Sequence, residues 1–566
     1  MNHPIIPIAV VQAASKERKR QAPKGRRVEP SALADVQRLL GSESRQADLL
    51  IEHLHKIQDH FGHLSAAHLA ALAQEMRLAQ TEVYEVATFY HHFDVVKEGE
   101  AAPAPLTVRV CDGLSCEMAG ARDLLDRLPA LLGREVRVIA APCIGRCEQA
   151  PAAVVGQNPV PNATAEAVVA TVAARAVQHA PEGFFDFSSY RAAGGYALLA
   201  QCVSGDRDVE SVLKTMEDSG LRGLGGAGFP AGRKWRIVRA EAGPRLMAVN
   251  IDEGEPGTFK DRVYLERDPH RFLEGMLIAA WAVGIEKIYI YLRDEYHGCR
   301  AMLETELDKL RLAPPMAGMP QIELRRGAGA YICGEESAMI ESIEGKRGMP
   351  RLRPPYVAQV GLFGRPTLEH NFETLFWVRE ILEKGGAWFT SHGRNGRKGL
   401  RSFSVSGRVK SPGVKLAPAG ITIQELIDEH CGGMQDGHTF YAYLPGGASG
   451  GILPATMNSI PLDFDTLQPY GCFIGSAAVI VLSDQDTATN AARNMMRFFH
   501  HESCGQCTPC RVGTAKAAHL MEKPKWDLAL LADLSLVMRD ASICGLGQAA
   551  PNPMDCVVKY FPHELA

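Results

Sequence analysis

Apolar residues follow two different spacings in the first third of the chain. Between residues 30 and 96 they recur every three or four positions, as at Leu50, Leu54 and Ile57, which is typical of amphipathic helices. At LTVRVC (residues 106–111) and again at EVRVIAAPC apolar and polar residues alternate as in strands, and the segment ARDLLDRLPALL between them has helical spacing. A small helical bundle followed by an α/β module is therefore expected.

The remaining two thirds show a similar succession of patterns. Residues 208–219 have helical spacing, whereas SFSVSGRVK and VKLAP predict a β-hairpin around Ser411-Pro412-Gly413. ITIQELIDEHCGG is typical of a helix capped by glycine and TFYAYLPGG of a strand. Three helices are expected near the C-terminus, at 491–499, 511–521 and 528–538.

Length and composition limit the class of protein. A chain of 566 residues is too long for one core, so three to five domains are expected. With 46% hydrophobic residues and a net charge of −4, nothing indicates wholesale disorder or a nucleic-acid surface. The longest apolar runs, 276–285 and 473–482, fall well short of the roughly 20 residues that cross a bilayer, so no membrane span is predicted.

The N-terminal segment and the cysteine usage are relevant to the cellular compartment of the protein. Residues 1–29 contain KERKRQAPKGRR without hydrophobic periodicity, which we interpret as a flexible basic arm and not as a secretory signal. Fourteen cysteines, seven of them in close sets, favour metal ligation in a reducing cytoplasm over a secreted protein. A polar, Ala-rich stretch at 178–195 is interpreted as a linker.

A glycine-rich stretch, GLRGLGGAGFPAGRKW (residues 220–235), is the first candidate site. Six glycines in thirteen residues allow positive φ and let backbone N–H groups approach an anion, with Lys234 placed to add a charge. The stretch also satisfies G-x-G-x-x-G, but a Rossmann loop leaves a strand and this one follows a helical pattern. A phosphate or cofactor cradle outside the usual dinucleotide pattern is therefore predicted.

The first cysteine set lies at the expected strand ends. Cys111-x4-Cys116 and Cys143-x3-Cys147 place two pairs on facing loops, as in thioredoxin-like ferredoxins that carry a [2Fe-2S] cluster. A four-cysteine zinc site and two structural disulfides are the alternatives.

The second set is Cys504-x2-Cys507-x2-Cys510. Three thiolates this close are a stronger signal for an iron-sulfur cluster than for zinc, whose pairs are normally separated. A fourth ligand is required, and Cys544 and Cys556 are the candidates. Cys556 sits in an amphipathic run more typical of packing.

Three further stretches extend the pattern: GAGAYICGEESAMIESIEGKRGMPRLRPPY, GRPTLEHNFETL and SCGQCTPCRVGT. With the glycine-rich loop and NIDEGEPGTFKDR they resemble the flavin- and NADH-binding subunit of respiratory complex I and its relatives, the diaphorase subunits of soluble formate dehydrogenases and bidirectional hydrogenases. The resemblance runs from about residue 220 to the C-terminus. IQDHFGHLS and VYEVATFYHHF resemble the 24-kDa-type subunit of complex I, and having both modules on one chain is more similar to the soluble enzymes.

The resemblance implies a multidomain α/β fold. Its expected parts are a basic arm (1–29), a helical bundle (30–98), a thioredoxin-like [2Fe-2S] domain (104–180), a Rossmann-like FMN- and NADH-binding domain (196–398), a ubiquitin-like β-grasp insert (399–485) with an architectural role, and a helical [4Fe-4S] bundle (486–566).

It also implies site residues, position by position. The matches to FMN-binding positions are Gly223, Gly225, Gly226, Lys234, Asn250, Asp252, Glu253, Tyr331, Gly334, Glu335, Asn371 and Thr374. The matches to positions that grip NAD(H) are Phe229, Glu255, Glu336, Arg353 and Tyr356, of which Glu255 and Glu336 are the candidate catalytic residues. Leu224 stands where the family commonly has arginine, and His370 where asparagine is expected. Cys111, Cys116, Cys143 and Cys147 would hold the [2Fe-2S] cluster, and Cys504, Cys507, Cys510 and Cys544 the [4Fe-4S] cluster.

The implied function is conversion between two-electron and one-electron transfer. NAD(H) exchanges a hydride and iron-sulfur clusters pass single electrons, so an FMN between them connects the two modes. The expected partner is a larger cytoplasmic subunit that oxidises formate at a molybdenum or tungsten pterin and carries further clusters. A bidirectional hydrogenase or a complex I type dehydrogenase is the alternative, and a non-enzymatic metal scaffold or a thiol oxidoreductase explains fewer of the motifs.

Overall fold

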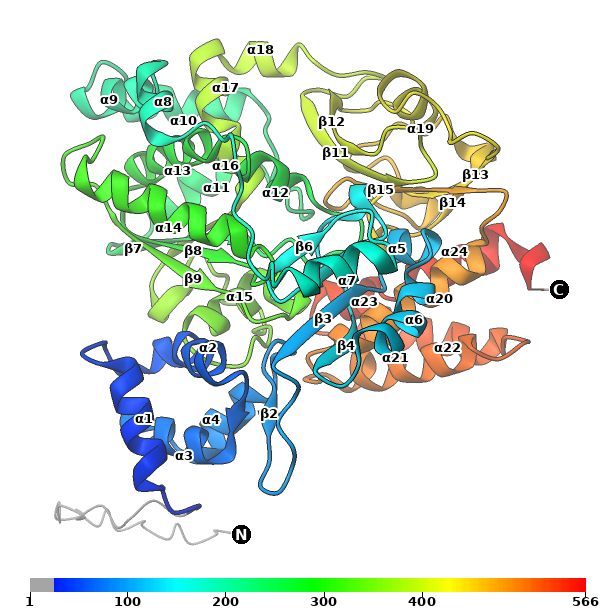
Figure 1. The fold of residues 1–566 in the computed structure, drawn as a ribbon. Coiled ribbons are helices and arrows are strands. Elements are labelled where there is room, and N and C mark those ends of the chain that lie inside the picture. The colour runs from blue at the N-terminus through cyan, green and yellow to red at the C-terminus, as the bar shows by residue number, and fades with distance from the viewer. Residues whose placement is uncertain (1–24, 566) are drawn as a thin grey trace, which may run out of the picture.

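The N-terminal bundle packs against the large central domain. A computed structural model describes residues 25–565 (Figure 1), so most of the predicted basic arm lies outside the described residues. The bundle comprises α1 (Pro30–Leu40), α2 (Leu50–Phe61), α3 (Ala66–Met76) and α4 (Gln80–Ala87). The Tyr90 hydroxyl, just after α4, donates to the Lys346 carbonyl at 2.7 Å, and the Arg325 guanidinium donates to the Asp48 carboxylate at 2.7 Å. These contacts fix the bundle on the central domain.

The next module is an α/β layer with the strand order β4-β3-β5-β6. Its strands are β3 (Leu106–Cys111), β4 (Val136–Ala141), β5 (Ala153–Val155) and β6 (Asn158–Val160), and its helices are α5 (Leu114–Met118), α6 (Ala121–Leu132) and α7 (Ala165–Ala173). β3 and β4 are parallel, and these two strands with α6 between them are the elements that the sequence patterns predicted. The first cysteine pair therefore begins where β3 ends.

The interpretation of 178–195 as a plain linker is wrong in part. This stretch contains α8 (Phe187–Ala192), and the buried Tyr190 hydroxyl donates to the Glu274 carboxylate at 2.6 Å. Two aromatic residues spaced three apart anchor the helix, a signal too short to outweigh the polar composition around it.

The central domain is built on four parallel strands in the order β10-β7-β8-β9. They are β7 (Arg245–Ile251), β8 (Ile285–Leu292), β9 (Gln321–Arg326) and β10 (Thr367–Asn371). Around them lie α9 (Ala197–Ser204), α10 (Val209–Asp218), α11 (Ala231–Ala240), α12 (Lys260–Leu265), α13 (Pro269–Val283), α14 (His297–Leu312), α15 (Glu336–Ile343), α16 (Phe372–Phe376), α17 (Val378–Lys384) and α18 (Gly386–Thr390). The glycine-rich loop connects α10 to α11, so it follows a helix, as the spacing predicted.

A second sheet follows, with the order β12-β11-β15-β13-β14. Its strands are β11 (Leu400–Gly407), β12 (Gly413–Pro418), β13 (Phe440–Leu444), β14 (Leu453–Pro454) and β15 (Ala478–Ser483), and a short helix begins with α19 (Ile423–Glu425). The antiparallel pair β11 and β12 is the predicted hairpin. In Figure 1 this sheet lies above the C-terminal helices.

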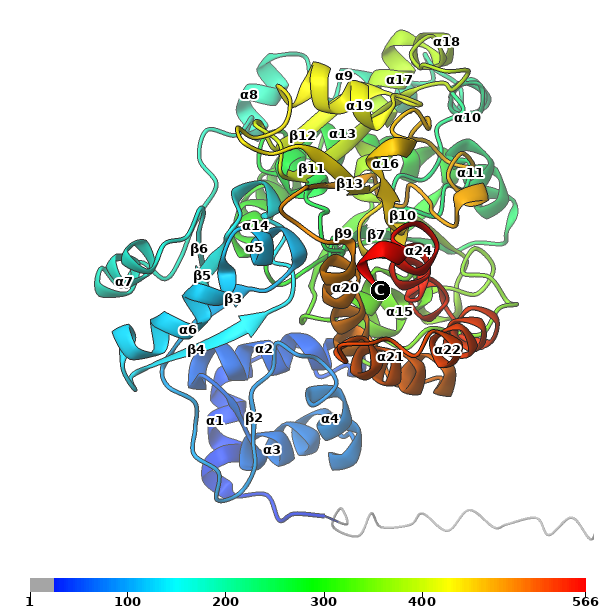
Figure 2. The same ribbon diagram turned by 90° about the vertical axis from the view of Figure 1, so that its right-hand side faces the viewer.

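The chain ends in a group of helices: α20 (Ala488–Glu502), α21 (Thr508–Met521), α22 (Leu528–Ala541), α23 (Gly545–Ala549) and α24 (Asn552–Tyr560). Figure 2 shows them beside the central domain, with α20 and α21 close to the N-terminal bundle. The Asn494 amide on α20 donates to the Asp112 carbonyl at 2.9 Å, which ties this group to the loop that follows β3. Within residues 25–565, no helix combines the length and apolar character needed to cross a membrane.

Candidate functional site

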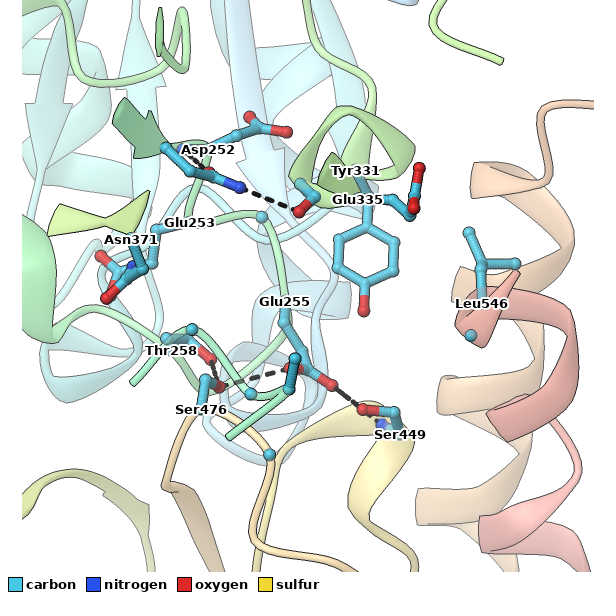
Figure 3. Close-up of a pocket in the computed structure, with 18 of the residues that line it drawn as sticks. Asp252, Glu253, Glu255, Thr258, Tyr331, Glu335, Asn371, Ser449, Ser476 and Leu546 are labelled. Atoms are coloured by element: carbon cyan, nitrogen blue, oxygen red, sulfur yellow. Dashed lines mark hydrogen bonds between the residues drawn. The ribbon is translucent and has the colours of Figure 1, made fainter. Parts of the chain in front are cut away.

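A cavity of about 300 Å³ opens at the carboxyl ends of β7 and β10 (Figure 3). Ten of the sequence-predicted residues line it: Gly225, Gly226, Asn250, Asp252, Glu253, Glu255, Tyr331, Gly334, Glu335 and Asn371. Asn250 and Asn371 are register partners at the ends of the paired strands, which brings their side chains to the same edge of the sheet. This is the edge at which ligands bind in parallel α/β sheets.

The glycine-rich loop approaches the cavity closely. A Cβ on Gly225 would lie 2.9 Å from the Asn371 Cβ, and Gly226 has a φ of 119°, so neither position accommodates a side chain without strain. The Thr374 hydroxyl accepts the Leu224 N–H at 2.9 Å, and the Gly223 N–H donates to the Phe229 carbonyl at 2.8 Å. Gly223 and Thr374 therefore shape the loop and do not line the cavity.

Three acidic residues on the segment after β7 differ in their surroundings. Asp252 is half-buried, but its Oδ2 is covered and has no hydrogen-bond partner among the residues described, and this burial of the carboxyl raises its pKa well above the usual range. Burial, and then the nearby Asp261 carboxylate, raises the pKa of Glu253 to about 7. Glu255 accepts hydrogen bonds from the Ser449 N–H at 3.0 Å and the Ser476 hydroxyl at 3.3 Å (Figure 3).

The other predicted residues lie outside the cavity. The Glu336 carboxylate forms an ion pair with Arg353 at 2.7 Å, and the Phe229 and Tyr356 side chains are exposed. The Lys234 ammonium donates to the Glu369 carbonyl at 3.1 Å, an anchor on β10 that the sequence did not indicate. Arg353 also pairs with Glu335 at 2.6 Å, and because Glu335 lines the cavity, the Glu336–Arg353 pair lies beside it.

Several lining residues were missed. Lys260 and Asp261 belong to GEPGTFKDR, so this motif could have indicated them, and the buried Lys260 ammonium lies 2.7 Å from Asp261 and 3.0 Å from Glu373. Ser449, Phe473, Gly475 and Ser476 come from the β-grasp region, which corrects the prediction that this region has only an architectural role. No local sequence signal marks these four residues, because only the tertiary fold brings them to the cavity.

The two positions that depart from the family pattern have structural explanations. His370 is buried and its Nε2 accepts the Trp235 indole N–H at 2.8 Å, so the imidazole faces α11. Leu224 is buried in the core beneath the glycine-rich loop. Glu369, beside His370, is buried as well, and burial raises the pKa of its carboxyl to about 8.

The N-terminal cysteines come together in a buried group. The Sγ atoms of Cys143 and Cys147 are 3.3 Å apart, and the thiols of Cys111 and Cys116 are in hydrogen-bond contact with each other. A hydrogen bond from Cys111, and another from Cys147, lowers the pKa of the Cys143 thiol well below its usual range. Four thiols gathered in this way fit an iron-sulfur cluster.

The C-terminal cysteines surround a small second cavity. Cys504, Cys507, Cys510 and Cys544 all line it. Cys556 lies elsewhere, with its Sγ 3.5 Å from that of Cys472. The geometry thus brings Cys544, and not Cys556, to the cysteine triple.

The two cavities adjoin. Ile332 and Leu546 line both of them, Ile332 next to Tyr331 and Leu546 on α23. Two aliphatic side chains therefore form the shared wall between the larger cavity and the C-terminal cysteines.

Family models match four parts of the chain. The Nuo51 FMN-binding domain matches residues 216–380, and the thioredoxin-like [2Fe-2S] ferredoxin matches 36–176. The SLBB domain matches 402–453, and the NADH-ubiquinone oxidoreductase-F iron-sulfur binding region matches 490–566.

Individual relatives and solved structures agree with these models. An NADH-quinone oxidoreductase subunit of Rhizobium meliloti is 40% identical over 399 residues, 68% of this chain and 94% of that protein. The mitochondrial NADH dehydrogenase [ubiquinone] flavoprotein 1 of Dictyostelium discoideum is 40% identical over 64% of this chain and 79% of its own length. A chain of an H2-reduced NAD+-reducing [NiFe]-hydrogenase superimposes with a TM-score of 0.80 at 34% identity, covering 92% of each chain.

The cofactors follow from these matches: FMN, a [2Fe-2S] cluster and a [4Fe-4S] cluster, with NAD(H) as the substrate. The residues present fit them. The unpartnered Asp252 carboxyl and the side-chain-free surface of the glycine-rich loop suit a flavin, and two groups of four thiols suit the clusters. On these grounds the chain belongs to the family of NADH-oxidising, FMN- and iron-sulfur-containing electron-transfer subunits that includes the Rhizobium meliloti NADH-quinone oxidoreductase protein.

Proposed function

We propose that this chain is the NAD(H)-linked subunit of a cytoplasmic NAD+-dependent formate dehydrogenase. In this proposal a larger partner subunit oxidises formate at a molybdenum or tungsten pterin and delivers electrons to the C-terminal cysteine set. The segment GRPTLEHNFETLFWVREI and the presence of both modules on one chain support it. The role in converting between two-electron and one-electron transfer rests on one observation: Ile332 and Leu546 line both the larger cavity and the cavity of the four cysteines.

The cavity residues would hold the FMN, which when bound exchanges a hydride with NAD(H) and single electrons with a cluster. Gly225 and Gly226 offer backbone N–H groups to a phosphate without steric obstruction, and Lys260 lines the same cavity. Burial raises the pKa of the Asp252 carboxyl well above its usual range, which favours the protonated form that can donate a hydrogen bond to the ring system. Asn250 is held for this purpose by its amide, which donates to the Gly334 carbonyl at 2.9 Å.

NAD(H) would bind beside the cavity. Phe229 and Tyr356 offer exposed aromatic faces for adenine, and the Glu336 carboxylate can accept from ribose hydroxyls. Glu255 lines the cavity, is held there by Ser449 and Ser476, and would orient the nicotinamide. None of these roles requires a side chain to transfer a proton during the hydride step.

The identity of the coenzyme tests the assignment of Glu336. Its negative charge disfavours a 2′-phosphate, so we expect NADH to be preferred over NADPH and Glu336→Gln to reduce this preference by roughly tenfold, the equivalent of about 1.4 kcal/mol. Steady-state kcat/KM values for both coenzymes with ferricyanide as acceptor measure it. Glu341→Gln, on the same helix but paired with Arg351, is the control. An unchanged ratio in Glu336→Gln would show that this role is assigned to the wrong residue.

A second candidate is the diaphorase subunit of an NAD+-reducing hydrogenase. It is favoured by the superposition of this chain on a hydrogenase chain over 92% of both. Purifying the protein from its native cells with its bound partners, and assaying NAD+ reduction by formate and by hydrogen in parallel, separates the two. Formate-driven reduction with molybdenum or tungsten in the complex is the expected result, whereas hydrogen-driven reduction with a nickel-containing partner would replace the first proposal by the second.

A further inference from the structure

Two histidines and a glutamate meet where three parts of the protein join. His91 lies in the turn after α4, and His501 and Glu502 form the end of α20. One ligand atom from each of the three lies within 4.8 Å of the other two, and the centroids of the two imidazole rings are 4.0 Å apart. The first residue belongs to the N-terminal bundle and the other two to the C-terminal helices, so no short sequence motif unites them.

The donor set suits a zinc ion. Two imidazoles and one carboxylate, with a further position open to water, are a recurrent set of Zn²⁺ ligands. Both imidazoles are exposed at the surface, so an ion can reach them, whereas the Glu502 carboxylate is buried and only 3% exposed. The two imidazoles are therefore accessible from solvent, and the negatively charged carboxylate lies on their inner side.

The Glu502 carboxylate is held in place from the inside. Its Oε2 accepts the Tyr331 backbone N–H at 2.9 Å, and its Oε1 lies 3.1 Å from the His501 Nδ1. Fixing a ligating carboxylate through a second hydrogen bond is typical of metal sites. The Asp112 carboxylate also lies close enough to act electrostatically on His501, so a second acidic group faces a bound cation.

A deeper group, His55, His92 and Asp294, has the same donor types but different surroundings. The Asp294 carboxylate there already pairs with the His92 Nδ1 at 2.7 Å and with the Arg326 guanidinium. The Arg326 cation therefore already neutralises this carboxylate. The Glu502 carboxylate, by contrast, forms no ion pair with an arginine or lysine in the described part of the chain, which distinguishes the outer group.

We propose that His91, His501 and Glu502 bind one Zn²⁺ ion that fastens the N-terminal bundle to the end of α20. Because Glu502 also holds the Tyr331 backbone, the ion would stabilise one wall of the flavin cavity from outside. The site does not depend on whether the partner subunit oxidises formate or hydrogen.

Equilibrium dialysis of the anaerobically purified holoprotein against Zn²⁺ tests the proposal, with iron content measured in parallel so that both clusters are known to be intact. We expect the wild type to retain one Zn²⁺ per chain more than His91→Ala and His501→Ala do. His500→Ala is the matched control, since His500 is also an exposed histidine at the end of α20 and should leave binding unchanged. Equal retention by the wild type and the His91→Ala/His501→Ala double variant would overturn the site.

Zinc K-edge X-ray absorption of the loaded wild type checks the identity of the ligands. Nitrogen and oxygen neighbours at about 2.0–2.1 Å, with imidazole scattering, are expected, while sulfur neighbours at about 2.3 Å would place the ion on cysteines and refute the proposal.

Discussion

The two cysteine sets are connected to the flavin cavity in different ways. The C-terminal set is separated from it by the aliphatic side chains of Ile332 and Leu546. The N-terminal set is linked to it through charged groups, since the Arg293 guanidinium donates both to the Cys143 carbonyl, at 2.7 Å, and to the Glu253 carbonyl. One connection is a short apolar wall and the other is a buried polar network.

The two connections should transmit different effects between the flavin cavity and the cysteine sets. The side chains of Ile332 and Leu546 do not titrate, and the Glu335 carboxylate, which lines the cavity, acts on Cys504 and Cys544 only electrostatically. Electron exchange between the cavity and the C-terminal set should therefore depend mainly on their proximity. In the polar network Arg293, Glu253 and Tyr296 are all buried, and a change of charge on one of them acts strongly on the others because little water screens it. We therefore expect the C-terminal set to carry the exchange with the partner and the N-terminal set to respond to charge near the flavin.

The largest effect should come from removing the fourth cysteine of the C-terminal set. Cys544→Ser should abolish the [4Fe-4S] signal in electron paramagnetic resonance of the reduced protein and lower the iron content from about six to about two per chain. Electron exchange with the partner should be lost with it. Cys556→Ser, whose thiol lies beside Cys472, is the control. If Cys556→Ser lost the signal and Cys544→Ser kept it, the assignment of the fourth ligand would be reversed.

A smaller effect on turnover is expected from the N-terminal set. Cys116→Ser should remove the [2Fe-2S] signal but leave NADH oxidation by ferricyanide within about twofold of the wild type, because the hydride step needs only the flavin and the coenzyme. A point substitution is preferable to deleting residues 1–190, since the deletion would expose Arg325 and other buried groups that contact the bundle. A loss of activity that parallels the loss of the cluster would show that electrons pass through the N-terminal set.

The contrast between the sets also shows what the sequence could predict. The spacings of Cys111 with Cys116 and of Cys504 with Cys510 identified these cysteines as candidate cluster ligands, because ligands on one loop or one helical turn are close in sequence. The strands and helices that carry them were predicted for the same reason, since hydrophobic periodicity is local. The position of Cys544 came from family resemblance and not from spacing.

Other residues of the site could not be predicted. Ser449 and Ser476 reach the cavity from a different sheet, and their hydrogen bonds to Glu255 depend on how two domains pack. The lysine at the cavity is Lys260 and not the predicted Lys234, which is anchored on β10, because the direction of α11 decides where its side chain points. Such placements depend on tertiary contacts, which produce no periodic pattern in the sequence.

The smallest and most specific effect concerns pH. Glu253 receives hydrogen bonds from the Asp261 N–H at 2.9 Å and the Tyr296 hydroxyl at 2.8 Å, and burial together with Asp261 raises the pKa of its carboxyl to about 7. As pH rises through 7 the group therefore gains a negative charge close to Arg293 and the N-terminal cysteines. Added negative charge disfavours reduction, so the reduction potential of the [2Fe-2S] cluster should fall between pH 6 and pH 8, by less than the about 59 mV per pH unit of full proton coupling.

Redox titrations of both clusters at pH 6, 7 and 8, followed by electron paramagnetic resonance, measure this dependence. Glu253→Gln keeps the shape of the side chain but cannot ionise, so its [2Fe-2S] potential should lose most of the pH dependence. The [4Fe-4S] potential serves as the internal control, because the hydrogen bonds of Arg293 connect Glu253 to Cys143, whereas Ile332 and Leu546 form the wall beside the C-terminal cysteines. Equal pH slopes for the two clusters in the wild type would mean that the polar network does not distinguish the two regions, and the comparison would then rest on distance alone.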